Sequence, residues 1–201
     1  MFMINLFAPV KKITSRKVKL IMQTLIINFS GRQSGNCHHI GKVIQEISQD
    51  NGNEVVFKEM YQLEISPCGK CNYECKRCPY ISDDIFDLYS LICSSKLVYY
   101  IVPNYCDAPN ANFFIFKERS QSFFQNQPHL FEKFMQIKKK FIVVSNTEKD
   151  IFVKSFKFHV AKDKKPDILF LAGKEYKKSV IKDNLMLVEE VRLALENFIN
   201  N

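Results

Sequence analysis

Four cysteines lie within eleven residues of this sequence, at Cys68, Cys71, Cys75 and Cys78. Thiolates are soft ligands, and four of them select zinc or an iron–sulfur cluster. Zinc ribbons usually place about 15–20 residues between their two cysteine pairs, whereas only three residues separate Cys71 from Cys75. This compact spacing favours an iron–sulfur cluster. A zinc site and unligated thiols are the alternatives.

A second chemically suggestive stretch is the loop at residues 30–37, which follows an apolar run and precedes a helical pattern. Small and hydroxyl-bearing residues let backbone N–H groups converge on an anion, and a helix N-terminus adds about half a positive charge. The loop has neither the dinucleotide fingerprint nor the Gly-Lys-Ser/Thr of a P-loop. It therefore favours a phosphate monoester, with a plain turn as the alternative. Its candidate ligands are Ser30, Arg32, Ser34, Gly35, Asn36 and Cys37.

A third stretch, Pro103, Asn104, Tyr105 and Cys106, follows another apolar run. Pro103 and Pro109 stiffen this loop, and Tyr105 offers a flat aromatic face. The carboxyl ends of parallel strands meet at one edge of a sheet, where ligands bind in open α/β folds. A phosphate loop beside a rigid aromatic loop predicts a mononucleotide site.

The elements that must position these loops follow from hydrophobic periodicity. Apolar runs predict strands, helical spacing predicts helices, and the cysteine block at 65–82 has neither period and is expected to be a loop. Strands alternating with helices indicate parallel βαβ units and a three-layer α/β sandwich. The alternating Lys and Phe residues of 152–158 are interpreted as a half-buried strand. The predicted strands are 24–30, 54–58, 97–102, 141–145 and 167–171, and the predicted helices are 35–49, 83–94, 110–126 and 185–198.

Composition excludes several classes of protein. At 46% hydrophobic and 25% charged residues, the chain matches ordinary globular proteins rather than disordered or fibrous ones. No apolar run reaches the ~18 residues of a membrane span. Seven clustered cysteines do not fit a secreted disulfide framework, so we expect a cytoplasmic protein. We expect one domain at 22–201, after a basic N-terminal extension at 1–21.

The net charge of +8 is concentrated in residues 1–20 and 138–182. A basic band of this kind is usually a solvated face, and sometimes a dock for phosphates or an acidic partner. We do not expect nucleic-acid binding.

Four motifs in this order resemble the NADPH-dependent FMN reductase branch of the flavodoxin-like superfamily, and specifically the iron–sulfur flavoproteins. Together they span about residues 24–147, and Cys37 departs from the Thr or Ser usual in the family. The motifs are Ser30, Arg32, Gly35 and Asn36 in the first loop; Pro67, Cys68 and Cys71 followed by Asp83 and Asp84; Pro103 with Tyr105; and the pair Glu118 and Arg119.

The resemblance implies a flavodoxin-like sandwich with a five-stranded parallel sheet of order 2-1-3-4-5. It also implies FMN, with its phosphate at residues 30–37 and its ring against residues 103–106. A compact four-cysteine motif at this point of the chain implies a [4Fe–4S] cluster on Cys68, Cys71, Cys75 and Cys78. The family is frequently dimeric, so we expect a homo-oligomer.

The expected function is an FMN-dependent oxidoreductase whose cluster links two-electron and one-electron chemistry. Its electrons would come from NAD(P)H or a ferredoxin-like donor. No hydrolytic triad or carboxylate pair is present, and no catalytic side chain is required because the cofactors do the chemistry. Two alternatives stay open. One is a dedicated electron carrier without small-molecule turnover, and the other a zinc-stabilised or cluster-free binding protein.

Overall fold

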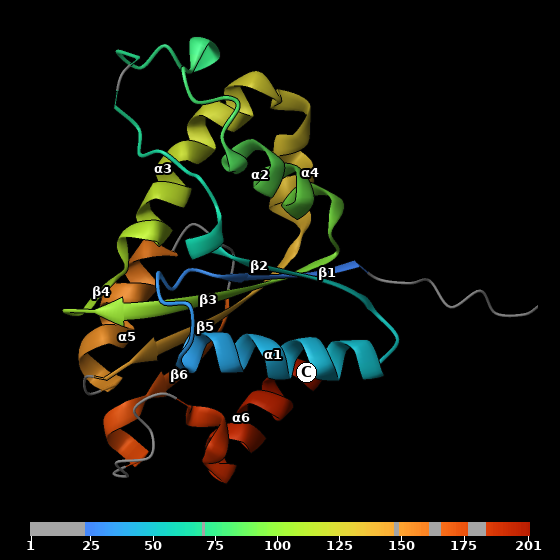
Figure 1. The fold of residues 1–201 in the computed structure, drawn as a ribbon, viewed down its shortest axis with the longest axis vertical. Helices are drawn as coiled ribbons and strands as arrows, with labels where there is room; N and C mark the ends of the chain where they lie inside the picture. Colours follow the sequence, from blue (N-terminus) through green and yellow to red (C-terminus); the bar gives the residue numbers. More distant parts are fainter. Residues whose placement is uncertain (1–22, 70, 147–148, 161–165, 177–183) are drawn as a thin grey trace, which may run out of the picture.

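The computed structural model describes residues 23–69, 71–146, 149–160, 166–176 and 184–201. The expected extension at 1–21 lies outside these ranges. Strands and helices alternate along most of the chain, as the hydrophobic pattern predicts (Figure 1). The elements are β1 (Gln23–Asn28), α1 (Asn36–Asp50), β2 (Glu54–Glu59), α2 (Asp84–Ser94), β3 (Leu97–Tyr105), β4 (Ala108–Pro109), α3 (Ala111–Asn126), α4 (Phe131–Gln136), β5 (Lys138–Ser145), α5 (Lys149–His159), β6 (Asp167–Ala172) and α6 (Glu189–Asn200).

The sheet has the order β2-β1-β3-β5-β6, and all four pairings along this path are parallel. This is the 2-1-3-4-5 order of flavodoxin-like folds, so the fold class predicted from the sequence is confirmed. The prediction of five strands needs one correction. A sixth strand, the two-residue β4, pairs antiparallel with the end of β3.

The missed hairpin arises because β3 continues through Pro103 to Tyr105 rather than stopping at the proline. Cys106 and Asp107 then turn the chain with φ values of 50° and 60°. Two successive residues with positive φ form the kind of turn that joins tightly paired strands. Neither residue is a glycine, so the usual sequence signal for this turn is absent.

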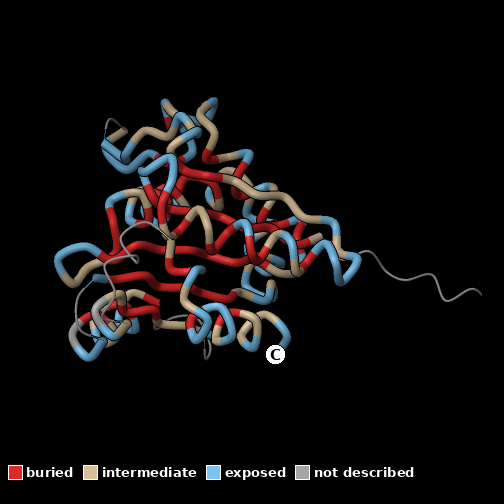
Figure 2. Tube along the Cα trace, turned by 60° about the horizontal axis from the view of Figure 1, so that its bottom comes forward, coloured by how far each residue is buried: buried red, intermediate tan, exposed pale blue. Residues whose placement is uncertain are grey.

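Alternate residues of each strand face two different cores, which makes the molecule three layers thick. On β1, Leu25 and Ile27 face the core formed with α2, α3 and α5, whereas Ile26 faces the core formed with α1 and α6. Buried residues accordingly run along the central strands (Figure 2). A sheet covered on both faces explains why its strands read as continuous apolar runs.

The segment 152–158 is a helix, α5, and its interpretation as a strand is wrong. Phe152 and Phe156, four residues apart, are fully buried, whereas Phe158 is 79% exposed. A strand would place Phe156 and Phe158 on the same face, but a helix separates them. The segment resembled a strand because Phe152, Phe156 and Phe158 are four and two positions apart, which also fits a period of two.

Within the described ranges, no helix combines the length and the apolar character needed to cross a bilayer.

Candidate functional site

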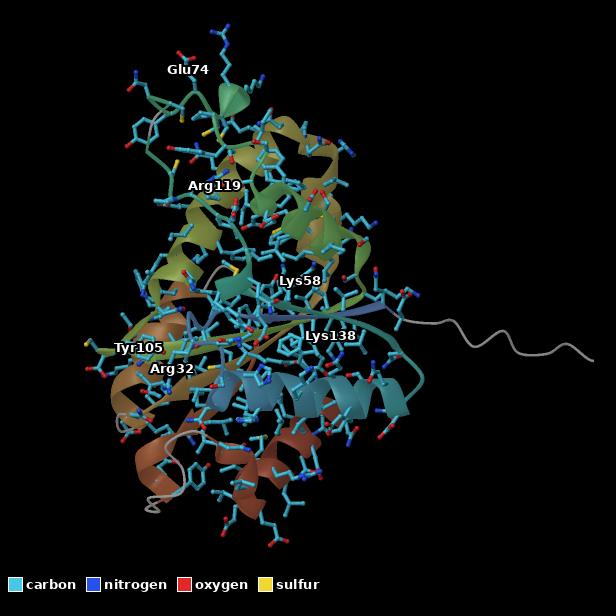
Figure 3. All side chains as sticks on the ribbon, in the orientation of Figure 1. Arg32, Lys58, Glu74, Tyr105, Arg119 and Lys138 are labelled. Carbon is cyan, nitrogen blue, oxygen red and sulfur yellow. The ribbon has the colours of Figure 1, made fainter. Side chains whose placement is uncertain are left out.

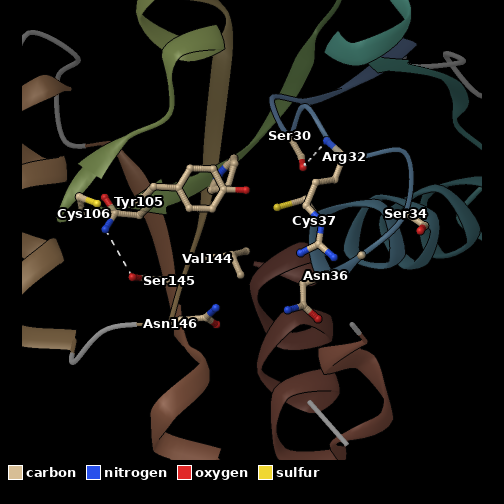
Figure 4. Close-up of a pocket in the computed structure, with 13 residues that line it drawn as sticks. Ser30, Arg32, Ser34, Asn36, Cys37, Tyr105, Cys106, Val144, Ser145 and Asn146 are labelled. Atoms are coloured by element: carbon tan, nitrogen blue, oxygen red, sulfur yellow. Dashed lines mark hydrogen bonds between the residues drawn. The ribbon is translucent and has the colours of Figure 1, made fainter. Parts of the chain in front are cut away.

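A pocket opens at the carboxyl edge of the sheet, between the loop that follows β1 and the carboxyl ends of β3 and β5 (Figure 4). All ten residues predicted from the sequence to bind a cofactor line this pocket. The carboxyl end of β5 and the residue after it supply three further lining residues that the prediction did not include: Val144, Ser145 and Asn146. Their position could have indicated this, because they lie at the carboxyl end of the strand next to β3 in the sheet. The predicted lining residues are Ser30, Arg32, Ser34, Gly35, Asn36, Cys37, Pro103, Asn104, Tyr105 and Cys106.

The loop after β1 has the shape and polarity of an anion site. Its turn begins where the Ser30 hydroxyl accepts a hydrogen bond from the Arg32 backbone N–H at 3.1 Å. Gly35 has a φ of +136°, a conformation that other residues rarely adopt. It leads directly into α1, whose first turn contains no acidic residue. The positive end of a helix dipole and the Arg32 guanidinium therefore face the same pocket as the loop backbone.

Asn36 has a second role that the sequence did not reveal. Its Oδ1 atom accepts a hydrogen bond from the backbone N–H of Leu185 at 2.8 Å. Leu185 begins the short 3₁₀ helix Leu185–Leu187, which precedes α6. The phosphate-type loop is thereby tied to the C-terminal part of the chain, 149 residues away in sequence.

The carboxyl end of β3 contributes an unsatisfied acceptor on the opposite side of the pocket. Asn104 is only 3% exposed, and its Nδ2 lies 3.4 Å from the Ser145 hydroxyl. Among the described residues, its Oδ1 atom is buried without a hydrogen-bond partner. Leaving a buried acceptor of this kind without a hydrogen bond costs about 1–3 kcal/mol of stability. A ligand that carries an N–H donor, such as the imide N–H of a flavin ring, fits this position.

Tyr105 stands at the mouth of the pocket, where its side chain is 51% exposed and its ring faces the pocket interior (Figure 4). An aromatic face at this position can cover a flat heteroaromatic ligand. Polar donors on one side, an unsatisfied acceptor on the other and an aromatic face at the mouth together suit a ligand with a phosphate and a ring.

Cys37 presents a neutral thiol to the pocket. Its side chain is 6% exposed, and burial raises the pKa of this thiol to about 12, although the nearby Arg32 charge opposes the shift. The thiolate is the reactive form of cysteine, so Cys37 is inert at neutral pH. A small, weakly polar group thus occupies a position where the flavin reductases that the sequence resembles usually have a hydroxyl.

We expect this buried thiol to make stability fall with increasing pH above about 9. The native protein keeps the Cys37 proton up to about pH 12, whereas the thiol of the unfolded chain ionises near 9. The native state therefore binds more protons in this interval, and this one group lowers the free energy of unfolding by up to about 1.4 kcal/mol per pH unit. Urea unfolding at several pH values measures how steeply the free energy of unfolding changes with pH.

The comparison variant is Cys37→Ala. Its free energy of unfolding should fall less steeply with increasing pH than that of the wild type. Cys106→Ala removes an exposed thiol from the same pocket and is the matched control. Equal slopes for wild type and Cys37→Ala would contradict the expectation.

The four clustered cysteines lie in the long loop between β2 and α2, far from this pocket in the ribbon (Figures 1 and 3). Cys75 and Cys78 are buried, Cys71 is partly buried and Cys68 is exposed. Burial, followed by the charges of Cys71, Cys68 and Cys78, raises the pKa of Cys75. The thiols are therefore close enough to influence one another. Over the described part of the chain, however, no three His, Cys, Asp or Glu side chains converge on a metal position.

Helix α3 holds this cysteine loop through Arg119, which is completely buried. One terminal nitrogen donates to the Ser66 carbonyl at 2.6 Å and to Asp83 Oδ2 at 2.5 Å. The other donates to the Tyr80 carbonyl at 2.9 Å and lies 3.9 Å from Cys78 Sγ. The Asp83 and Arg119 motifs of the sequence are thus partners in an ion pair that closes the base of the loop.

Two further residues of α3 fix the loop at other points. Glu118 accepts a hydrogen bond from the Cys68 backbone N–H at 2.7 Å. Asn126 donates to the Cys75 carbonyl at 2.9 Å. The Glu118–Arg119 pair therefore serves the cysteine loop, and neither residue lines the pocket at the sheet edge.

Comparison with known proteins shows similarity in structure rather than in sequence. No protein-family model matches this sequence, and no curated protein sequence matches it. Among solved structures, RosB with bound 8-demethyl-8-formylriboflavin-5'-phosphate aligns with a TM-score of 0.60 at 9% identity, over 90% of this chain and 77% of that one.

Two reductases are similar to the same degree. An azoreductase from Bacillus anthracis aligns with a TM-score of 0.58 at 9% identity, over 90% of this chain and 98% of that one. An NAD(P)H:quinone oxidoreductase from Methanothermobacter marburgensis aligns with a TM-score of 0.58 at 10% identity, over 90% and 94% of the two chains. These similarities establish a shared flavodoxin-like fold.

Proposed function

We propose that this protein is an FMN-dependent oxidoreductase of the NADPH-dependent FMN reductase type, with NAD(P)H as its electron donor. The observation that carries the proposal is the pocket at the carboxyl edge of the sheet, which combines an anion-binding loop with an unsatisfied amide acceptor. The sequence motifs and the fold of the flavin-related structures support the same assignment.

In this proposal, each side of the pocket binds one part of the cofactor. The backbone of residues 33–37, the start of α1 and the Arg32 side chain hold the phosphate. Asn104 Oδ1 accepts from a ring N–H, and Tyr105 shields the ring at the pocket mouth. Bound FMN would supply hydride and single-electron chemistry. The protein contributes binding, orientation and the exclusion of water.

The test is a titration of the ligand-free protein with FMN, followed by an assay of NADH and NADPH oxidation with a quinone or an azo dye as acceptor. We expect one FMN per chain and donor oxidation that depends on bound FMN. Asn104→Leu should weaken FMN binding about tenfold, because one hydrogen bond to the ring is lost. Asn197→Leu, at an exposed position of α6, is the matched control.

Failure to bind FMN would refute the assignment. Stoichiometric FMN without oxidation of either nucleotide would favour a dedicated electron carrier with a reduced protein, such as a ferredoxin, as its donor. The oligomeric state measured on the same sample tests the expected homo-oligomer.

We also infer a metal-binding role for the cysteine loop, with a [4Fe–4S] cluster as the first choice and zinc as the alternative. The chemistry of the donor set supports this, since four thiols lie in one loop and the buried Arg119 cation of α3 packs against that loop. The positions of the thiols do not yet form a ligand set, so binding would require the loop to rearrange. Iron, sulfide and zinc assays on anaerobically purified protein distinguish the cluster, zinc and unligated thiols.

A further inference from the structure

A buried carboxylate lies beneath the loop that follows β1. Glu59, the last residue of β2, is 7% exposed and is adjacent to Asn28 in the register of β1 and β2. Glu59 Oε1 accepts from Asn28 Nδ2 at 3.1 Å and lies 2.9 Å from His38 Nδ1, and Oε2 accepts from the Tyr61 hydroxyl at 3.1 Å. The carboxylate is therefore surrounded by three side chains from β1, α1 and the residues after β2.

The Glu59 carboxylate decides how the Asn28 amide is oriented. An ionised carboxylate only accepts hydrogen bonds, so it requires the NH₂ group of Asn28 to face it. The amide oxygen then points the other way, where it accepts from the Ser30 backbone N–H at 2.9 Å. Because Asn28 is completely buried, water cannot replace either bond. Glu59 thus fixes the Asn28 side chain, which in turn fixes the start of the pocket loop.

The turn that follows depends on this contact. Ser30 is held by Asn28, and the Ser30 hydroxyl accepts from the Arg32 N–H. The backbone N–H groups of Ser30 and Arg32 are thereby bonded inside the protein. The chain leaves this turn with Ser34, Gly35 and Cys37 lining the pocket. None of Asn28, Glu59 and His38 lines the pocket itself, so their effect on a ligand must be indirect.

We propose that Glu59, acting through Asn28, is the positioning residue that sets the shape of the phosphate loop and thereby the preference for a phosphorylated flavin over riboflavin. The proposal rests on the proposed function, because it takes FMN as the ligand. It also assigns a role to His38: His38 and Tyr61 hold the Glu59 carboxylate in place.

The test compares the affinities of ligand-free variants for FMN and for riboflavin, measured by fluorescence titration. Glu59→Leu removes the acceptor and leaves Asn28 Nδ2 buried without a partner, so we expect the FMN Kd to rise about tenfold and the riboflavin Kd to change less than about threefold. Glu59→Gln keeps an oxygen facing Asn28 and should preserve the preference for FMN. Glu54→Leu, at an exposed position of the same strand, is the control.

A second readout needs no ligand. Amide hydrogen exchange of the peptide spanning residues 29–37 should be faster in Glu59→Leu than in wild type, Glu59→Gln or Glu54→Leu. If Glu59→Leu does not fold, Tyr61→Phe takes its place. It removes one donor to the carboxylate and should raise the FMN Kd about threefold without changing the riboflavin Kd.

The outcomes separate this inference from the proposed function. Equal increases in the FMN and riboflavin Kd values, or unchanged exchange in residues 29–37, would overturn the positioning role while leaving FMN binding established. If the wild type binds neither flavin, the proposed function fails. In that case, amide hydrogen exchange of residues 29–37 is the only test of whether Glu59 positions the loop. Faster exchange in Glu59→Leu would support this role, and unchanged exchange would refute it.

Discussion

Replacing Asp83 by alanine is expected to lower the free energy of unfolding by about 3–5 kcal/mol, because the substitution leaves the buried Arg119 charge without its partner. The Arg119 side chain is 0% exposed and that of Asp83 is 12% exposed, and two hydrogen bonds join them at 2.5 and 3.2 Å. Asp83 also caps α2 by accepting from the Ile85 N–H at 3.2 Å, which adds to the loss. Urea denaturation followed by circular dichroism measures the change.

Three further variants identify the cause of that loss. Asp87→Ala removes an exposed acid from the first turn of the same helix and should change stability by less than about 1 kcal/mol. Asp83→Asn keeps the helix cap, so its loss of unfolding free energy should lie between those of Asp83→Ala and Asp87→Ala. The double variant Asp83→Ala/Arg119→Met should lose less stability than the sum of its single variants, because removing both charges leaves neither one buried alone. A loss in Asp83→Ala no larger than in Asp87→Ala would contradict the role of the ion pair.

Phe156→Ala is expected to lower the free energy of unfolding by about 3–5 kcal/mol, because it opens a cavity in an aromatic core. The Phe156 ring is fully buried, and its centroid lies 5.8 Å from that of Phe113, 5.9 Å from Phe141 and 6.2 Å from Phe170. Phe158→Ala is the matched control, since that ring is 79% exposed. It should change stability by less than about 0.5 kcal/mol.

The same pair of variants tests the secondary structure of residues 149–159. In a strand, Phe156 and Phe158 would point to one face and the two substitutions would have similar effects. In the helix α5 they face the core and the solvent respectively, so the effects should differ by several kcal/mol. Similar losses for both variants would argue against the helix.

The hydrophobic pattern of the sequence was sufficient for the architecture because buried parallel strands and amphipathic helices have distinct periods. Its failure at α5 has a physical cause. Phe152 and Phe156 satisfy the helical period, but Phe152, Phe156 and Phe158 together also satisfy a period of two. The β3–β4 hairpin was missed because Cys106 and Asp107 adopt positive φ without the glycine or asparagine that normally marks such a turn.

The predicted binding residues line one pocket for a topological reason. Loops at the carboxyl ends of neighbouring parallel strands must meet, so residues 30–37 and 103–106 could be placed together without knowing any distance. The supporting contacts could not be predicted in this way. The pairing of Asn28 with Glu59 depends on strand register, and the contact of Asn36 with Leu185 joins positions 149 residues apart. The roles of Asp83 and Arg119 likewise required the packing of α3 against the cysteine loop.

Helix α3 has a consequence for how the sequence can vary. Near its start, Asn110 and Asn112 donate to the Phe29 carbonyl next to the pocket loop. At its end, Asn126 binds the cysteine loop. The sixteen residues of the helix span about 24 Å, and substitutions more than about 10 Å apart without shared partners have additive effects. Changes in the two regions should therefore show little epistasis, so that the cysteine loop can diverge in length and composition while the pocket keeps its own constraints.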